Sequence, residues 1–201
     1  KKSKIMKFLF DLGGVFFDWD PKNFFKDQFD NQSEMNFFLD NICNNDWNLQ
    51  QDKGRLIIDA ENDLITKFPN YEEKIKMYYP NHRKMIKGIF HESIELLYEL
   101  KKKNYSCYIL SNWSSETFEG MTEEYNFLKD FDGMIISGDI KLVKPDKKIF
   151  ELAIEKFNLT PNDTIFIDDR IENINAAQNL NFKTVHLTDP QRIKIKINEL
   201  I

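Results

Sequence analysis

Short apolar runs recur along the chain and predict the strands of a sheet. They cover residues 5–10, 106–110, 133–136, 164–167 and 183–187. Their length and their aliphatic and aromatic content are typical of buried strands. All but the first alternate with segments that carry apolar residues at helical spacing, namely 92–103, 146–157, 170–180 and 191–200. Alternating strands and helices predict a parallel sheet that is covered by helices on both faces.

Residues 18–87 follow a different pattern. This stretch is rich in Asn, Asp, Phe and Lys, and its apolar residues fall at helical intervals, as in Phe24, Phe25 and Phe29. Such spacing predicts an all-helical insertion after the first strand. No Gly/Ser-rich linker flanks it, so we expect it to pack on the rest of the chain. The predicted domains are a core of residues 1–17 and 88–201 and a helical insertion of residues 18–87.

Polar residues follow several of the predicted strands at the point where each run ends. Asp11 follows the first run, Ser111 follows the second, and Asp168 and Asp169 follow the fourth. Lys144 lies in a short loop after the third run. In an open α/β sheet, ligands bind beyond the carboxyl ends of the strands, so these side chains are expected to converge on one site.

Composition and charge exclude several classes of protein. With 201 residues, 41% of them hydrophobic, and 18 Phe, the chain is expected to be globular with a substantial core. The net charge of −5 arises from mixed signs, which gives no reason to expect a nucleic-acid partner. No run approaches the ~18 apolar residues that a membrane span requires, so no membrane partner is expected either.

The cysteines and the N-terminal residues bear on location. Cys43 and Cys107 lack metal-ligand spacing, and two thiols in a chain of this size favour reduced core residues over a disulfide. Residues 1–10 are basic and then apolar, as in a signal peptide. However, Lys7 interrupts the run, Asp11 ends it, and no small-residue cleavage site follows. We therefore expect a cytoplasmic protein.

The polar residues belong to four short motifs in a fixed order. These are Asp11-Leu12-Gly13-Gly14-Val15, Leu110-Ser111-Asn112, Val143-Lys144-Pro145-Asp146, and Ile167-Asp168-Asp169 with Asn173. In order and spacing they resemble the motifs of the haloacid dehalogenase-like hydrolase superfamily, over essentially the whole chain. The resemblance implies a Rossmann-like, three-layer α/β/α core with a five-stranded parallel sheet, and a small cap formed by the insertion. It also implies Mg²⁺-dependent hydrolysis of phosphate esters through an aspartyl-phosphate.

The resemblance assigns a nucleophile and a set of metal ligands. Asp11 would be the nucleophile, which is consistent with the use of carboxylates to divide a hydrolysis into two easier displacements. Asp11, the backbone carbonyl of Gly13, and Asp169 would bind Mg²⁺, a cation that prefers oxygen ligands. Asp168 would orient a metal-bound water or Lys144. Taken alone, Asp168 is also well suited to cap the helix that follows it.

The remaining motif residues are predicted to bind the phosphate. The charge on a transferring phosphoryl group must be neutralised, and the Lys144 ammonium would contribute to this as a point cation. The Ser111 hydroxyl and nearby backbone N–H groups, including that of Asn112, would hold the transferring oxygens. The expected partner is therefore a small-molecule phosphate ester.

Position 13 departs from the family pattern. Most phosphatases of this superfamily carry an aspartate two residues after the nucleophile, where it protonates the leaving group and then activates water; this chain has Gly13. General acid–base assistance is typically worth about 10²–10⁴-fold. Three explanations stay open: another acid such as Asp18, Asp20 or a cap residue substitutes, the leaving group is easily expelled, or catalysis is weak. The Asp-Leu-Gly start is similar to that of sugar 1-phosphate phosphatases, which favours a sugar phosphate.

Several other residues have more than one interpretation. Asp18-Trp19-Asp20 is an Asp-x-Asp triplet that could be mistaken for the nucleophile motif, and we place it at the start of the insertion because it follows Val15-Phe16-Phe17 and precedes Pro21. Arg55 is a candidate for binding an anionic substrate group or simply an exposed residue, and Trp113 either lines a pocket or packs. The histidines at positions 82, 91 and 186 lack any partner spacing and are interpreted as structural or solvated.

Two rival functions remain. A non-catalytic protein that binds a phosphometabolite would keep the fold and metal site without turnover, because Gly13 lacks the acid. A 2-haloacid dehalogenase would use Asp11 without a metal, but Asp168 and Asp169 would then place two unscreened carboxylates beside the nucleophile. Oligomeric state is left open.

Overall fold

The central sheet has five parallel strands in the order β5-β4-β1-β6-β7. The computed structural model describes residues 6–201. The strands are β1 (Lys7–Phe10), β4 (Ser106–Ser111), β5 (Gly133–Ile136), β6 (Thr164–Asp168) and β7 (Lys183–His186). This confirms the predicted parallel, five-stranded, three-layer α/β fold. Ile5, which the sequence placed in the first strand, lies outside the described residues.

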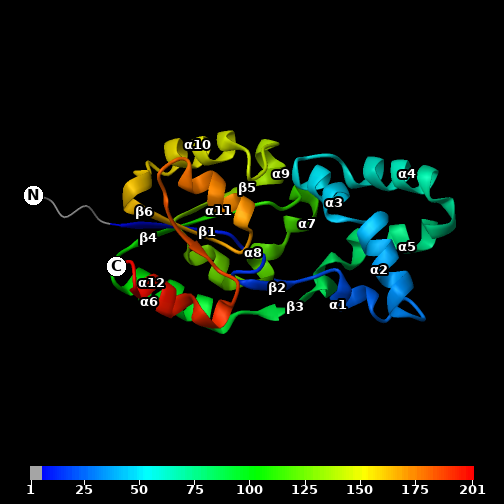
Figure 1. Cartoon of the computed structure of the whole chain (residues 1–201), viewed down its shortest axis with the longest axis horizontal. Helices are drawn as coiled ribbons and strands as arrows, with labels where there is room; N and C mark the ends of the chain where they lie inside the picture. The colour runs from blue at the N-terminus through cyan, green and yellow to red at the C-terminus, as the bar shows by residue number, and fades with distance from the viewer. Residues whose placement is uncertain (1–5) are drawn as a thin grey trace, which may run out of the picture.

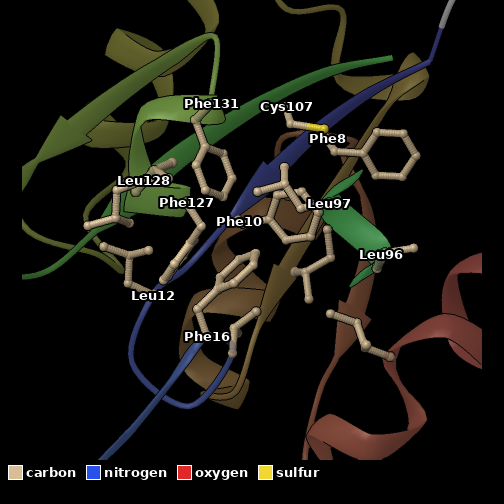
Figure 2. Packing of buried hydrophobic residues seen from close by; sticks show 14 of the residues in the cluster. Phe8, Phe10, Leu12, Phe16, Leu96, Leu97, Cys107, Phe127, Leu128 and Phe131 are labelled. Atoms are coloured by element: carbon tan, nitrogen blue, oxygen red, sulfur yellow. The ribbon is translucent and has the colours of Figure 1, made fainter. Parts of the chain in front are cut away.

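Alternation along the strands separates two hydrophobic clusters, one on each face of the sheet. Phe8 and Phe10 of β1 are fully buried on one face with Leu96 and Leu97 of helix α6, His91–Lys102 (Figure 2). Leu9, between them, is fully buried in the cluster on the other face. Because both faces are covered, these strands appear in the sequence as continuous apolar runs.

Helices cover both faces of the sheet, with α6 and α12 on one side and α10 and α11 on the other (Figure 1). The core elements other than strands are α6 (His91–Lys102), α7 (Ser115–Phe118), α8 (Met121–Glu124), η3 (Asn126–Asp130), α9 (Ser137–Ile140), α10 (Lys147–Lys156), η4 (Pro161–Asp163), α11 (Ile171–Gln178), η5 (Pro190–Arg192) and α12 (Ile193–Asn198). The four longer helical segments that the sequence predicted are therefore present. None of the helices within residues 6–201 combines the length and apolar character needed to cross a lipid bilayer.

The insertion contains its own hydrophobic cluster, which includes Phe25, Phe38 and Tyr78. Its elements are α1 (Lys22–Phe25), α2 (Gln32–Asn41), α3 (Asn45–Asp52), α4 (Ile57–Lys67), η1 (Pro69–Tyr71), α5 (Glu72–Met77) and η2 (Tyr79–Met85). Asparagine side chains cap two of these helices: Asn31 accepts from the Glu34 N–H, and Asn44 accepts from the Trp47 N–H. Caps of this kind explain part of the high Asn content. We call this helical insertion the cap.

A two-stranded antiparallel ribbon, β2 (Phe17–Trp19) and β3 (Ile86–Ile89), connects the core to the cap (Figure 1). The sequence did not predict these strands, because segments this short show too few alternations to reveal a period of two. Asp18 is paired with Gly88 inside this ribbon, and Asp20 accepts from the Lys22 N–H at the start of α1. The Asp-x-Asp triplet therefore begins the insertion, as predicted.

The register of the sheet determines where the site lies. Phe10 is in register with Ile109 of β4 and with Ile167 of β6. Asp11 therefore leaves the sheet between the ends of these two strands. The two cysteines are free and buried in separate clusters, Cys107 in the core and Cys43 in the cap, which agrees with the prediction of reduced thiols.

Candidate active site

A buried ammonium bridges two carboxylates at the carboxyl edge of the sheet. Lys144 Nζ lies 2.9 Å from Asp11 Oδ1 and 2.7 Å from Asp168 Oδ2. The Lys144 side chain is only 1% exposed. These residues come from the ends of β1 and β6 and from the loop before α10, so the structure brings together groups that are far apart in the sequence.

Lys144 and Asp168 are each held by further hydrogen bonds. The Asn112 side chain donates to the Lys144 carbonyl at 2.9 Å and accepts from the Lys144 N–H at 2.8 Å. Asp168 accepts from the Arg170 N–H at 2.9 Å and from Asn173 Nδ2 at 3.1 Å. With its acceptors used in this way, Asp168 fits the predicted role of orienting Lys144. The Asn112 side-chain amide thus fixes the Lys144 backbone relative to the end of β4.

Asp169 completes a cluster of carboxylates. Oxygens of Asp11, Asp168 and Asp169 all lie within 4.8 Å of one another. Gly14 makes this approach possible: it has a φ of +74°, and a Cβ at this position would lie 2.3 Å from Asp169 Oδ2. His186, which the sequence left without a partner, has Nε2 2.9 Å from the Asp169 carbonyl oxygen.

The charges in this cluster do not balance. Burial, followed by repulsion from Asp168, raises the pKa of Asp11 to about 8 and that of Asp169 to about 6, although Lys144 opposes both shifts. Three carboxylates facing a single ammonium favour the binding of a cation. A set of oxygen donors at this separation suits a hard divalent ion such as Mg²⁺.

A pocket of about 360 Å³ opens over this cluster and is lined by both the core and the cap. The core contributes Asp11, Gly13, Gly14, Asn112, Trp113, Lys144, Asp169, Arg170 and Asn173, which we call the core wall. The remaining residues, Trp19 of β2 and Asn45, Asn48, Leu49, Asp52 and His82 of the cap, form what we call the cap wall. The sequence contained no signal for the residues that α3 contributes, because they belong to no motif.

Gly13 and Ser111 differ in their relation to the pocket. Gly13 lines it, and a Cβ built on Gly13 would meet no atom within 4 Å. Ser111 is 1% exposed, is absent from the lining, and its Oγ has no hydrogen-bond partner among the described residues. Of these two residues, Gly13 is therefore part of the pocket wall, whereas the Ser111 hydroxyl is buried outside the lining.

Aromatic residues of the pocket also carry unpartnered polar atoms. Trp19 Nε1, Trp113 Nε1 and His82 Nδ1 are buried without hydrogen-bond partners among residues 6–201. Burial lowers the pKa of His82 to about 3, so this imidazole is neutral. Trp113 therefore lines the pocket, which was one of its two interpretations, and His82 is a pocket residue that the sequence did not identify.

Other candidates lie away from the pocket. Arg55 is ion-paired with Asp63 in the cap and is absent from the pocket lining. Asp18 and Asp20 are also absent from the lining. They therefore do not supply the carboxyl group that Gly13 lacks at this pocket.

Comparison with known proteins agrees with the motifs. The family model of haloacid dehalogenase-like hydrolases matches residues 37–187. The chain belongs to this family. A haloacid dehalogenase-like (HAD) family enzyme from Bacteroides thetaiotaomicron, solved in complex with magnesium and inorganic phosphate, is 30% identical to this chain. Its structure matches with a TM-score of 0.68 over 90% of this chain and 93% of its own. A HAD-like hydrolase from Porphyromonas gingivalis has a TM-score of 0.73 at 22% identity, with 98% of each chain covered, and shares the fold.

Curated relatives differ in activity. A sesquiterpene phosphatase from Aspergillus oryzae is 30% identical over 53% of this chain and 54% of its own length. An (S)-2-haloacid dehalogenase from Burkholderia cepacia is 26% identical over 48% of this chain and 42% of its own. The matched regions thus span about half the length of these relatives, and both phosphatases and dehalogenases occur among the proteins similar to this chain.

Proposed function

We propose that this protein is a Mg²⁺-dependent phosphatase that hydrolyses a small phosphorylated metabolite, with a sugar phosphate favoured, through an aspartyl-phosphate on Asp11. The observation that carries this proposal is the unbalanced carboxylate cluster around the buried Lys144. A phosphoryl-transfer site requires a nucleophile, a fixed cation and a place for a divalent metal, and these groups supply all three. The relative crystallised with magnesium and inorganic phosphate supports this assignment.

The metal would be held by Asp11, the backbone carbonyl of Gly13 and Asp169. A divalent ion bound there neutralises charge on the phosphate. Asp168 would remain bonded to Lys144, as its hydrogen bonds indicate. The raised pKa values of Asp11 and Asp169 support this proposal, because a cation would relieve the repulsion that contributes to them.

The other core residues would bind and orient the phosphoryl group. Asp11 would attack the phosphorus atom, and the Lys144 ammonium, held 2.9 Å from Asp11, would screen the phosphate oxygens. The Ser111 hydroxyl and the Asn112 backbone N–H would donate to those oxygens. The unpartnered Ser111 Oγ and the side-chain bonds that hold Asn112 in place support these roles.

The cap wall favours a leaving group that is polar and uncharged. Asn45, Asn48 and Trp19 offer hydrogen bonds, while neither lysine nor arginine from residues 18–87 lines the pocket. A second phosphate or a carboxylate on the substrate would therefore find no counter-ion in the cap. We propose that residues 18–87 act as a separate cap domain that selects a hydroxylated metabolite.

Two rivals are less well supported. Dehalogenases are among the relatives, but a halide-releasing site without a metal would leave the carboxylate cluster uncompensated. A binding protein without turnover would use the same pocket. A cytoplasmic location is proposed on the strength of the two free thiols.

Hydrolysis assays test the proposal. The protein with Mg²⁺ should release phosphate from an aryl phosphate and from at least one of a panel of sugar phosphates, nucleotides and acyl phosphates. Asp11→Asn should lower the rate at least about 10⁴-fold and keep the native circular dichroism spectrum. Asp18→Asn, in the Asp18-Trp19-Asp20 triplet outside the pocket lining, is the matched control and should keep full activity. A folded protein that hydrolyses none of these substrates would support the binding protein, and chloride release from 2-chloropropionate would support the dehalogenase.

A further inference from the structure

Gly13 has no side chain that could donate a proton to the leaving group. A proton donor would therefore have to be another residue that lines the pocket. The carboxyl groups that line it belong to Asp11, Asp52 and Asp169. Asp11 is the proposed nucleophile and Asp169 a proposed metal ligand. His82 also lines the pocket, but burial keeps its imidazole neutral. Asp52 is therefore the pocket carboxyl group that has no other role.

Asp52 is the last residue of α3, and contacts with the core hold it in place. Ser137 Oγ, just after β5, donates to the Asp52 carbonyl at 2.5 Å. The Asp52 carboxylate accepts from Asn48 Nδ2 of the same helix at 3.4 Å, and the Ser114 N–H, in the loop after β4, lies near enough to lower its pKa. These two loops lie at the edge of the sheet from which Asp11 projects, so Asp52 is positioned by the core although it belongs to the cap.

The surroundings of Asp52 favour a protonated carboxyl group near neutral pH. The residue is half-buried, and removal of its carboxyl group from water raises the pKa to about 7, against a smaller opposing effect of the Ser114 N–H. A general acid works best when its pKa lies near the working pH. Among titratable groups of other elements, Tyr78 and Tyr79 interact electrostatically with Asp52. The titratable and charged residues that line the same pocket are His82, Asp11, Asp169, Lys144 and Arg170.

We infer that Asp52 is the general acid and base of this phosphatase and replaces, from the cap side of the pocket, the carboxyl group that Gly13 lacks. The inference rests on the proposed function. In the first step Asp11 Oδ forms a bond to phosphorus, the bond from phosphorus to the leaving oxygen breaks, and the Asp52 proton moves to that oxygen to give the free alcohol. In the second step water attacks the phosphorus of the aspartyl-phosphate, the bond from phosphorus to Asp11 Oδ breaks, and a proton of the water moves to the Asp52 carboxylate. Inorganic phosphate is released, and the Asp11 carboxylate and the Asp52 carboxyl group are regenerated.

Leaving groups of different basicity distinguish this role from a structural one. Asp52→Asn should lower kcat for a sugar or alkyl phosphate by about 10²-fold or more, because an alkoxide needs its proton. The same variant should change the formation of the aspartyl-phosphate from 4-nitrophenyl phosphate only slightly, measured as the burst of nitrophenolate, because nitrophenolate leaves without a proton. The pH profile of kcat for the alkyl substrate should lose its upper limb near pH 7. Asp46→Asn, an exposed aspartate on the same helix, is the matched control and should match wild type throughout.

A second variant distinguishes loss of the general acid from loss of the contact between the cap and the core. Position 13 has room for a side chain, since a Cβ there meets no atom within 4 Å. Gly13→Asp placed in the Asp52→Asn background should restore turnover of the alkyl phosphate by at least about tenfold. Equal losses on both substrates without rescue would show that Asp52 only docks the cap, and no loss on either would also overturn the inference. A wild-type protein inactive on both substrates would instead overturn the proposed phosphatase, and this inference with it.

Discussion

The two walls of the pocket satisfy their polar groups in different ways. In the core wall, Lys144 and Asp11 are ion-paired at 2.9 Å, and Lys144 also contacts Asp168, outside the pocket lining, at 2.7 Å. The cap wall has no such ion pair among the described residues; its Trp19 Nε1 and His82 Nδ1 are buried without partners, as is Trp113 Nε1 of the core wall. Because the ionic groups of the core wall are already in place, we expect this wall to bind the phosphoryl group, which is the same in every substrate. We expect the unpartnered donors and acceptors of the cap wall to bind the leaving group, which differs between substrates. Changes to the core wall should therefore affect stability and chemistry, and changes to the cap wall should affect substrate choice.

The largest effect is expected when the buried ammonium is removed. Lys144→Met leaves Asp11, Asp168 and Asp169 facing one another without a cation, and breaking a buried ion pair costs about 3–5 kcal/mol. Urea unfolding without metal should show this loss, and Mg²⁺ should restore part of it. Lys147→Met, which removes an exposed lysine paired with Glu151, is the matched control and should unfold as wild type does. Equal stability of Lys144→Met and wild type would contradict the view that the core wall depends on this ammonium.

A somewhat smaller effect is expected from the metal. Mg²⁺ at about 100 times its Kd should stabilise the folded protein by about 2.7 kcal/mol. Asp169→Asn should lose most of this gain, yet without metal it should be at least as stable as wild type, because it removes one of three crowded carboxylates. Thermal melting with Mg²⁺ and after chelation measures both states. Asp189→Asn, outside the cluster, should behave as wild type, and an unchanged Mg²⁺ response in Asp169→Asn would exclude this residue as a ligand.

Low pH should destabilise the folded protein because His82, in the cap wall, is buried as the neutral imidazole. Its pKa is lowered from 6.5 to about 3 in the folded protein, so the unfolded chain binds the extra proton between these values and stability falls as the pH drops through that window. At pH 5 this effect should lower the free energy of unfolding of the wild-type protein by about 2 kcal/mol. His82→Gln cannot titrate, so urea unfolding should show the difference in stability between wild type and this variant shrinking from pH 7.5 to pH 5. His91→Gln, at an exposed position, should keep the acid sensitivity of wild type. A constant difference between wild type and His82→Gln would contradict a neutral, buried imidazole.

The smallest effect is expected from a single donor of the cap wall. Trp19→Phe keeps the ring and removes the unpartnered N–H, so KM for the preferred sugar phosphate should rise about fivefold, the cost of one hydrogen bond, with kcat nearly unchanged. Inhibition by inorganic phosphate should not change, because phosphate alone does not reach this donor. Trp47→Phe, whose indole N–H is bonded to Ala60 inside the cap, is the control. If Trp19→Phe weakened the binding of inorganic phosphate as much as it raised KM, the proposal that the core wall binds the phosphate and the cap wall binds the leaving group would be wrong.

The sequence by itself determined the sheet and predicted which polar residues follow its strands. Strands buried on both faces are continuous apolar runs, and in parallel strands the residues after each run must meet at one edge. Asp11, Ser111, Lys144 and Asp168 could therefore be selected from their positions after strands and within motifs. The β2–β3 ribbon was missed because strands of this length show too little alternation to reveal their period.

Only the tertiary structure decided the cap wall. Helical spacing of apolar residues identifies the face of α3 that packs inside the cap, but not which of its polar residues turns toward the core. Asp52 reaches the pocket because Ser137, which donates to its carbonyl, and Ser114 lie beside it, in loops more than half the chain away from Asp11. Its raised pKa depends in turn on the burial that this contact produces. Contacts between domains of this kind follow no local period, so the residues that would choose the substrate and protonate the leaving group can be identified only once the cap has been placed over the core.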